Sequence, residues 1–108
     1  MREYTPYIGG DWIPAVDGTF VEDRNPADGE VVARIQTAGP QDLEKALSSA
    51  QAAFASWSVA PVALREEILL KAADGLKAMQ EEAVDLLIQE SGSTWKKATQ
   101  EVAGSIGV

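Results

Sequence analysis

Hydrophobic and polar positions change their spacing once along this chain, near residue 38. Before that point, apolar residues alternate with polar ones in short runs separated by glycine-containing turns, which is typical of β-strands. After it, apolar residues recur at three- and four-residue steps, which is typical of amphipathic helices. The sequence therefore predicts an α+β chain over residues 1–108, with an antiparallel β meander in residues 1–38 and about four helices in residues 39–108.

Three turn signals divide the first third of the chain. Gly9-Gly10-Asp11 stands between two short apolar pairs and predicts a tight hairpin with an aromatic side chain packed across it. Asp17-Gly18 predicts the next turn. The segment Asn25–Glu30 reads NPADGE, in which the proline fixes φ at the start of a turn and Asp28-Gly29 supplies positive φ. We expect this segment to be a hairpin corner. A β meander this small is stable only when another layer packs against it.

The predicted helices of residues 39–108 can supply this second layer. Each of them has a start or a stop signal in the sequence. Gly39-Pro40 provides an N-cap and a first helical residue, and Pro61 opens a second helix in the same way. A third helix ends at Ser91-Gly92, and Thr94 caps a fourth. The first helix carries one apolar stripe: Leu43, Ala46, Leu47, Ala50, Ala53, Phe54 and Trp57. The second has Leu64, Ile68, Ala72, Leu76 and Met79 on one face, with Arg65 largely off it.

The fourth helix lacks a clear end. Small and apolar residues continue from Ala103 to Val108 without a polar last turn or a convincing cap. The sequence therefore predicts that this last helix is truncated.

Composition narrows the classes of function. Nine Lys and Arg against 17 Asp and Glu give a formal charge of −8, which opposes binding to nucleic acid or to anionic membranes. The chain has no cysteine and no histidine, so thiolate nucleophiles, histidine acid–base catalysis and the usual zinc ligands are excluded within it. No apolar run approaches the roughly 18 residues of a membrane span, and no apolar signal segment follows Met1. We expect a cytoplasmic protein with no nucleic-acid or membrane partner.

The remaining residues form no catalytic constellation. Adjacent carboxylates at Glu66-Glu67 and Glu81-Glu82 diverge by about 100° on a helix and cannot share a proton. The glycine pairs lack the strand and helix context of a dinucleotide-binding turn. The three tryptophans at 12, 57 and 95 are better explained by packing than by ligand stacking.

The elements taken together resemble the amino-terminal segment of the aldehyde dehydrogenase superfamily, in order and approximate spacing, across nearly the whole chain. The motifs that carry this resemblance are Tyr7–Trp12, Asn25–Val32, Asp42-Leu43 with Ala46, Ala50, Ala53-Phe54 and Trp57, Arg65 with Ile68-Leu69, Ala73-Asp74, Glu90–Gly92 and Glu101-Val102. The resemblance includes the members that oxidise aromatic aldehydes such as benzaldehyde or vanillin, through Glu90–Thr94, Lys97-Ala98 and Glu101-Val102.

The resemblance implies an NAD(P)-dependent oxidoreductase that converts an aldehyde to a carboxylic acid through a cysteine thiohemiacetal, hydride transfer and thioester hydrolysis. It also implies that this segment belongs to the α/β Rossmann-like cofactor-binding domain. In the family, the nucleophile, the general base and the residues that contact NAD or NADP lie further along than this chain reaches. No catalytic or cofactor-binding residue is carried over, and we expect the chain alone to bind no cofactor and to be inactive.

Two lesser sites follow from the resemblance. Some members hold a monovalent cation through main-chain oxygens and a carboxylate at positions that match Asp23, Arg24 and Glu90. The alternative for Glu90, an exposed carboxylate without a ligand, stays open. The fourth helix lines the aldehyde entry tunnel in the family, and Gln100 and Gly104 match positions in the tunnel wall.

The partners that the resemblance implies are the remainder of an aldehyde dehydrogenase or a second copy of this chain, so an oligomer is expected. An alternative of another class is a free-standing, non-catalytic interaction module that pairs with a full-length enzyme or with itself. A generic small α+β binding domain is a third reading, supported by composition only.

Overall fold

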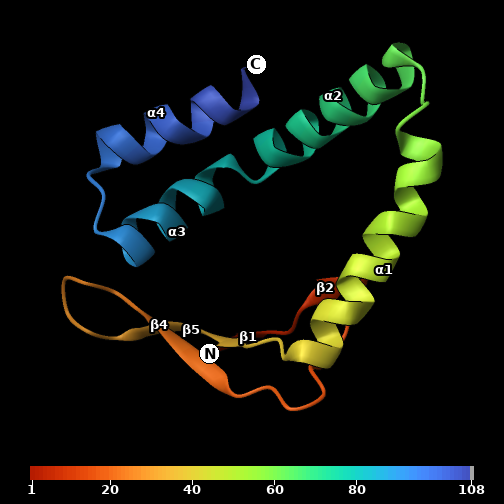
Figure 1. The fold of residues 1–108 in the computed structure, drawn as a ribbon. Coiled ribbons are helices and arrows are strands. Elements are labelled where there is room, and N and C mark those ends of the chain that lie inside the picture. Colours follow the sequence, from red (N-terminus) through yellow and green to blue (C-terminus); the bar gives the residue numbers. More distant parts are fainter. Residues whose placement is uncertain (108) are drawn as a thin grey trace. The chain divides into compact units, whose positions relative to one another are not determined.

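The computed structural model describes residues 1–107, and Val108, the last residue of the predicted fourth helix, lies outside them (Figure 1). Two compact units divide the described residues. The first comprises Met1–Arg24 and Val31–Val59, and the second comprises Asn25–Glu30 and the chain from Ala60 onward. The elements are β1 (Arg2–Tyr4), β2 (Tyr7–Ile8), β3 (Asp11–Trp12), β4 (Phe20–Arg24), β5 (Val31–Gln36), α1 (Pro40–Trp57), α2 (Val62–Ala78), α3 (Gln80–Ser91) and α4 (Trp95–Ile106). The predicted α+β order, strands before helices, is confirmed.

The main sheet of the first unit is mixed. Its strand order is β1-β5-β4, and β4 pairs antiparallel to β5 as the sequence predicts. The prediction of a purely antiparallel meander is wrong for β1, because this strand pairs parallel to β5. Parallel strands need a long connection, and here residues 5–30, which include the β2–β3 hairpin and β4, separate the two. Arg34 on β5 bonds Glu3 on β1 at 2.9 Å (Nη1 to Oε1), and its guanidinium lies 4.7 Å from the centre of the Phe20 ring.

The β2–β3 hairpin agrees with the sequence prediction. Tyr7 pairs with Trp12 across the two strands, and the centres of their rings lie 5.1 Å apart. Gly9 and Gly10 have φ values of 66° and 94°, a backbone conformation that side chains with a Cβ rarely adopt. The two glycines therefore make the tight turn that brings the aromatic rings together.

Helix α1 begins at Pro40 after an extended Gly39, as predicted. Asp42, in the first turn, is 1% exposed, and its Oδ2 accepts the Gly39 N–H at 2.9 Å. Both carboxylate oxygens also accept the Val16 N–H at 3.3 Å. The structure therefore shows Asp42 as a buried cap that joins α1 to the loop before β4.

The second unit has its core between α3 and α4, which lie side by side (Figure 1). Val84 on α3 packs against Ala98 and Val102 on α4, and all three are buried. Leu87 and Ile106 pack around this cluster and are partly buried. No helix among residues 1–107 combines the length and the apolar character that crossing a membrane requires.

The apolar face predicted for α2 is not a buried face. Leu64 and Ile68 are each 44% exposed, and no residue of α2 is buried. Arg65, which the sequence places off the face, is only partly exposed, and its Nε donates to the Ala60 carbonyl at 3.2 Å. The helical spacing places these apolar residues on one side of α2 as predicted, and that side is largely exposed in the described residues, while Arg65 binds the start of its own helix.

Candidate functional site

The NPADGE corner is held by four short hydrogen bonds. Asn25 N–H donates to the Glu30 carbonyl at 2.9 Å, and Gly29 N–H donates to the Asn25 carbonyl at 2.8 Å. The side chain of Asn25 accepts Ala27 N–H, and that of Asp28 accepts Glu30 N–H, both at 2.9 Å. Only Gly29 has positive φ (77°), so the expectation that Asp28 shares this conformation is wrong. The Asx-type bonds fix the corner without it.

Gly92 brings the end of α3 against this corner, within the second unit. Its φ is 65°, the left-handed conformation of a helix C-cap, and its N–H donates to the Ile88 carbonyl at 3.0 Å. A Cβ at this position would lie 3.0 Å from Cγ of Pro26. The predicted Ser91-Gly92 stop is confirmed; the left-handed backbone at residue 92 favours glycine, and a Cβ there would also be tight against Pro26.

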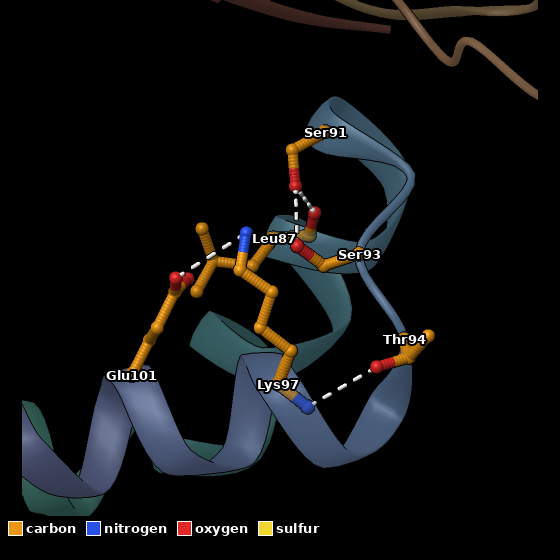
Figure 2. Close-up of polar contacts among 6 residues, drawn as sticks. All are labelled: Leu87, Ser91, Ser93, Thr94, Lys97 and Glu101. Carbon is orange, nitrogen blue, oxygen red and sulfur yellow. Dashed lines mark hydrogen bonds and ion pairs between the residues drawn. The ribbon is translucent and has the colours of Figure 1, made fainter.

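The connection from α3 to α4 is rigidly bonded (Figure 2). Ser91 Oγ donates to the Leu87 carbonyl at 2.6 Å and lies 2.9 Å from Ser93 Oγ. Thr94 Oγ1 accepts the Lys97 N–H at 3.3 Å, which confirms Thr94 as the N-cap of α4. Lys97 Nζ lies 3.5 Å from a carboxylate oxygen of Glu101, one turn further on (Figure 2). The Thr94 cap fixes where α4 begins.

Gln100 and Gly104 occupy the face of α4 that α3 leaves uncovered. Both are exposed, whereas Ala98 and Val102 on the opposite side are buried. A Cβ added at Gly104 would meet no atom within 4 Å. The structure therefore presents the two predicted tunnel-wall residues together on one accessible surface, one helical turn apart. Their contact with a substrate stays a prediction.

The candidate cation ligands fall in different units. Asp23 and Arg24 end β4 in the first unit, and Arg24 pairs with Glu22. Oδ2 of Asp23 is a buried atom without a hydrogen-bond partner. Glu90 lies in α3 of the second unit, where it is exposed and has an interaction of its own. Within residues 1–107, no group of three or more acidic side chains is placed to hold a metal ion, and the cation site stays a prediction.

Asp42 has a structural role that the sequence pattern did not predict. Its burial and its bond to Val16, 26 positions earlier, come from the packing of the loop before β4 on the first turn of α1. The signal available in the sequence was the acidic residue three positions after the glycine N-cap, which is the spacing of a capping box. Its role is structural, since both carboxylate oxygens accept hydrogen bonds from backbone N–H groups.

Comparison with known proteins identifies the class to which these elements belong. The model of the aldehyde dehydrogenase family matches residues 12–108. Vanillin dehydrogenase of Corynebacterium glutamicum is 39% identical over 101 residues, which cover 92% of this chain and 21% of that protein. Malonate-semialdehyde dehydrogenase 1 of Geobacillus kaustophilus is 36% identical over 100 residues, which cover 93% of this chain and 20% of that protein.

A solved structure agrees with the sequence comparison. The crystal structure of an NAD-dependent benzaldehyde dehydrogenase from Corynebacterium glutamicum matches 90% of this chain and 21% of its own, with a TM-score of 0.83 and 37% identity. The chain belongs to the aldehyde dehydrogenase family, and it corresponds to the amino-terminal part of the Rossmann-like domain. It spans about a fifth of the length of the relatives it matches.

Proposed function

We propose that this chain supplies the amino-terminal segment of an NAD(P)-dependent enzyme that oxidises an aldehyde to a carboxylic acid, and that the chain alone is catalytically incomplete. The observation that carries the proposal is the family match over residues 12–108 combined with coverage of only about a fifth of each relative. The 108 residues include no cysteine and no histidine, so they offer neither a thiolate nor an imidazole for acyl chemistry.

In such an enzyme, this segment would contribute part of the surface that the aldehyde contacts. Ala98 and Val102 pack on α3, which leaves Gln100 and Gly104 together on the uncovered face of α4. We assign these two residues to the wall of the aldehyde passage. An aromatic aldehyde is the substrate class that fits the relatives named for vanillin and benzaldehyde, and the NAD dependence of the latter supports a nicotinamide cofactor.

The partner in this proposal is the remaining part of an aldehyde dehydrogenase. Leu43 and Leu47 on α1 are each 56% exposed and Phe54 is 67% exposed, so the apolar stripe of this helix is not covered by its own unit. Stripes of this size are typical of a surface that another layer buries. Self-association of the chain through the same stripe is the second candidate, and it makes the chain a non-catalytic interaction module.

The purified chain is expected to form no NADH or NADPH from vanillin, benzaldehyde or malonate semialdehyde. It is also expected to leave the fluorescence of added NADH and NADPH unchanged at millimolar concentrations. The assay follows absorbance at 340 nm, with the Corynebacterium glutamicum vanillin dehydrogenase as the positive control. Turnover that survives repurification and scales with the concentration of the chain would contradict the proposed division of roles.

A further inference from the structure

Two Asp-Gly pairs lie in the loops on either side of β4, Asp17-Gly18 before it and Asp28-Gly29 after it. The proposed function uses neither pair. An aspartate followed by glycine isomerises more readily than other aspartates, because glycine has no side chain to hinder the attack of its nitrogen on the neighbouring carboxyl group. The chain therefore carries the same reactive dipeptide in two different environments.

The reacting atoms of Asp28-Gly29 are held by the NPADGE corner. The Gly29 nitrogen, which is the nucleophile, donates its proton to the Asn25 carbonyl at 2.8 Å. The Asp28 carboxylate accepts the Glu30 N–H at 2.9 Å through Oδ1, and its Oδ2 lies 3.4 Å from Nδ2 of Asn25. Attack requires the nitrogen to lose its proton and the carboxyl carbon to turn toward it. These hydrogen bonds must therefore open before Asp28 can react.

The reacting atoms of Asp17-Gly18 are not held in this way. Among residues 1–107, neither the Asp17 carboxylate nor the Gly18 N–H has a hydrogen-bond partner, and Asp17 is exposed. Packing nevertheless favours glycine at position 18, because a Cβ there would lie 2.6 Å from Cβ of Ala15 and 2.6 Å from the carbonyl oxygen of Thr37. A larger residue, which would slow the reaction, is thus disfavoured by the fold.

We propose that Asp17 is a site of spontaneous isoaspartate formation and that the corner protects Asp28 from the same reaction. The Gly18 nitrogen loses its proton and bonds to the side-chain carboxyl carbon of Asp17, and one water leaves as a succinimide ring closes. One water then opens the ring. Opening at the side-chain carbon restores aspartate, whereas opening at the main-chain carbonyl carbon gives isoaspartate. The product adds a main-chain methylene beside Val16, whose N–H donates to the cap residue Asp42.

The test is ageing of the purified, folded chain at neutral pH in water labelled with heavy oxygen. Each ring opening leaves one heavy oxygen on the aspartyl residue. Trypsin cleaves after Arg24 and Arg34, so the two pairs fall in separate peptides, 3–24 and 25–34. Mass spectrometry with electron-transfer fragmentation then locates the label and distinguishes isoaspartate from aspartate. We expect isoaspartate to form at least about tenfold faster at Asp17 than at Asp28, since two or more hydrogen bonds must open at Asp28.

Two comparisons separate the effect of the fold from that of the sequence. In guanidinium chloride, the rates at the two sites are expected to agree within about threefold, because unfolding removes the bonds of the corner. The variant Asn25→Ala removes the side-chain bonds to Asp28 and to the Ala27 N–H. It is expected to raise the rate at Asp28 at least about threefold, while Asp17 in the same molecule stays within about twofold.

Equal rates at Asp17 and Asp28 in the folded chain would overturn the proposal, as would a faster reaction at Asp28. A preference for Asp17 that is undiminished in guanidinium chloride would assign the difference to the flanking sequence and would also overturn it. A rate at Asp28 that does not respond to Asn25→Ala would contradict protection by the corner.

Discussion

Replacing Asp42 by alanine is expected to lower the free energy of unfolding of the first unit by about 2–4 kcal/mol. The carboxylate is 1% exposed and accepts the N–H groups of Gly39 and Val16. Alanine leaves both donors without their acceptor in a site that excludes water, and it removes the cap of α1. The measurement is urea unfolding followed by far-ultraviolet circular dichroism on the whole chain.

Two variants separate capping from general surface effects. Asp42→Asn keeps one acceptor oxygen, so its free energy of unfolding is expected to fall by roughly half as much as that of Asp42→Ala. Glu44→Ala, at an exposed position of the same helix, is expected to change the free energy of unfolding by less than about 0.5 kcal/mol. An Asp42→Ala chain as stable as the Glu44→Ala chain would show that the buried cap contributes nothing.

Replacing Ala98 by aspartate is expected to separate α3 from α4. Ala98 is fully buried and packs against Val84 and Val102. A carboxylate at this position is buried without a partner, and we expect a loss of about 3–5 kcal/mol. The α3–α4 pair supplies the buried core of the second unit, so proteolysis within residues 80–106 is expected to become fast.

The control is Ala103→Asp, one residue beyond Val102 on the exposed side of α4. It adds the same charge near the helix C-terminus, where the dipole disfavours it by up to about 1 kcal/mol. The two chains are compared by limited proteolysis with mass spectrometry and by thermal melting. Equal protection of α3 and α4 in both would contradict the core assigned to this unit.

Local chemistry made the helices predictable. Pro40 after Gly39, the glycine at 92 and the hydroxyl of Thr94 act within one turn of their own position, and each begins or ends a helix where the sequence predicts it. The β2–β3 hairpin was predictable for the same reason, because Gly9 and Gly10 alone permit its turn. Signals of this kind depend on neighbours in the chain, so they depend less on tertiary packing than strand pairing does.

The features that the sequence did not predict depend on residues far apart in the chain. The parallel pairing of β1 with β5 joins Arg2 to Ala33, and the bond of Asp42 to Val16 spans 26 positions. The exposure of α2 could not be read from its periodicity, because apolar residues occur on several of its sides. Such choices are made by packing, which a pattern of residue types does not specify.

The candidate site residues also fall into a group that local helical spacing predicts and a group that it does not predict. Gln100 and Gly104 were placed on one face by helical spacing, and the structure confirms that arrangement. The cation site was proposed from the family resemblance alone, and its predicted ligands Asp23, Arg24 and Glu90 belong to two different units, so the site stays a prediction. The proposed substrate passage would need further walls, which Gln100 and Gly104 do not provide by themselves.

We propose that this chain works as one part of an aldehyde-oxidising enzyme. It is tested most directly by the rate of vanillin-dependent NADH formation by the chimera in which residues 1–108 replace the matched segment of the Corynebacterium glutamicum vanillin dehydrogenase. We expect a folded chimera that oxidises vanillin within about tenfold of the parent enzyme, while residues 1–108 alone do not. A folded, NAD-binding chimera without any aldehyde oxidation would contradict it.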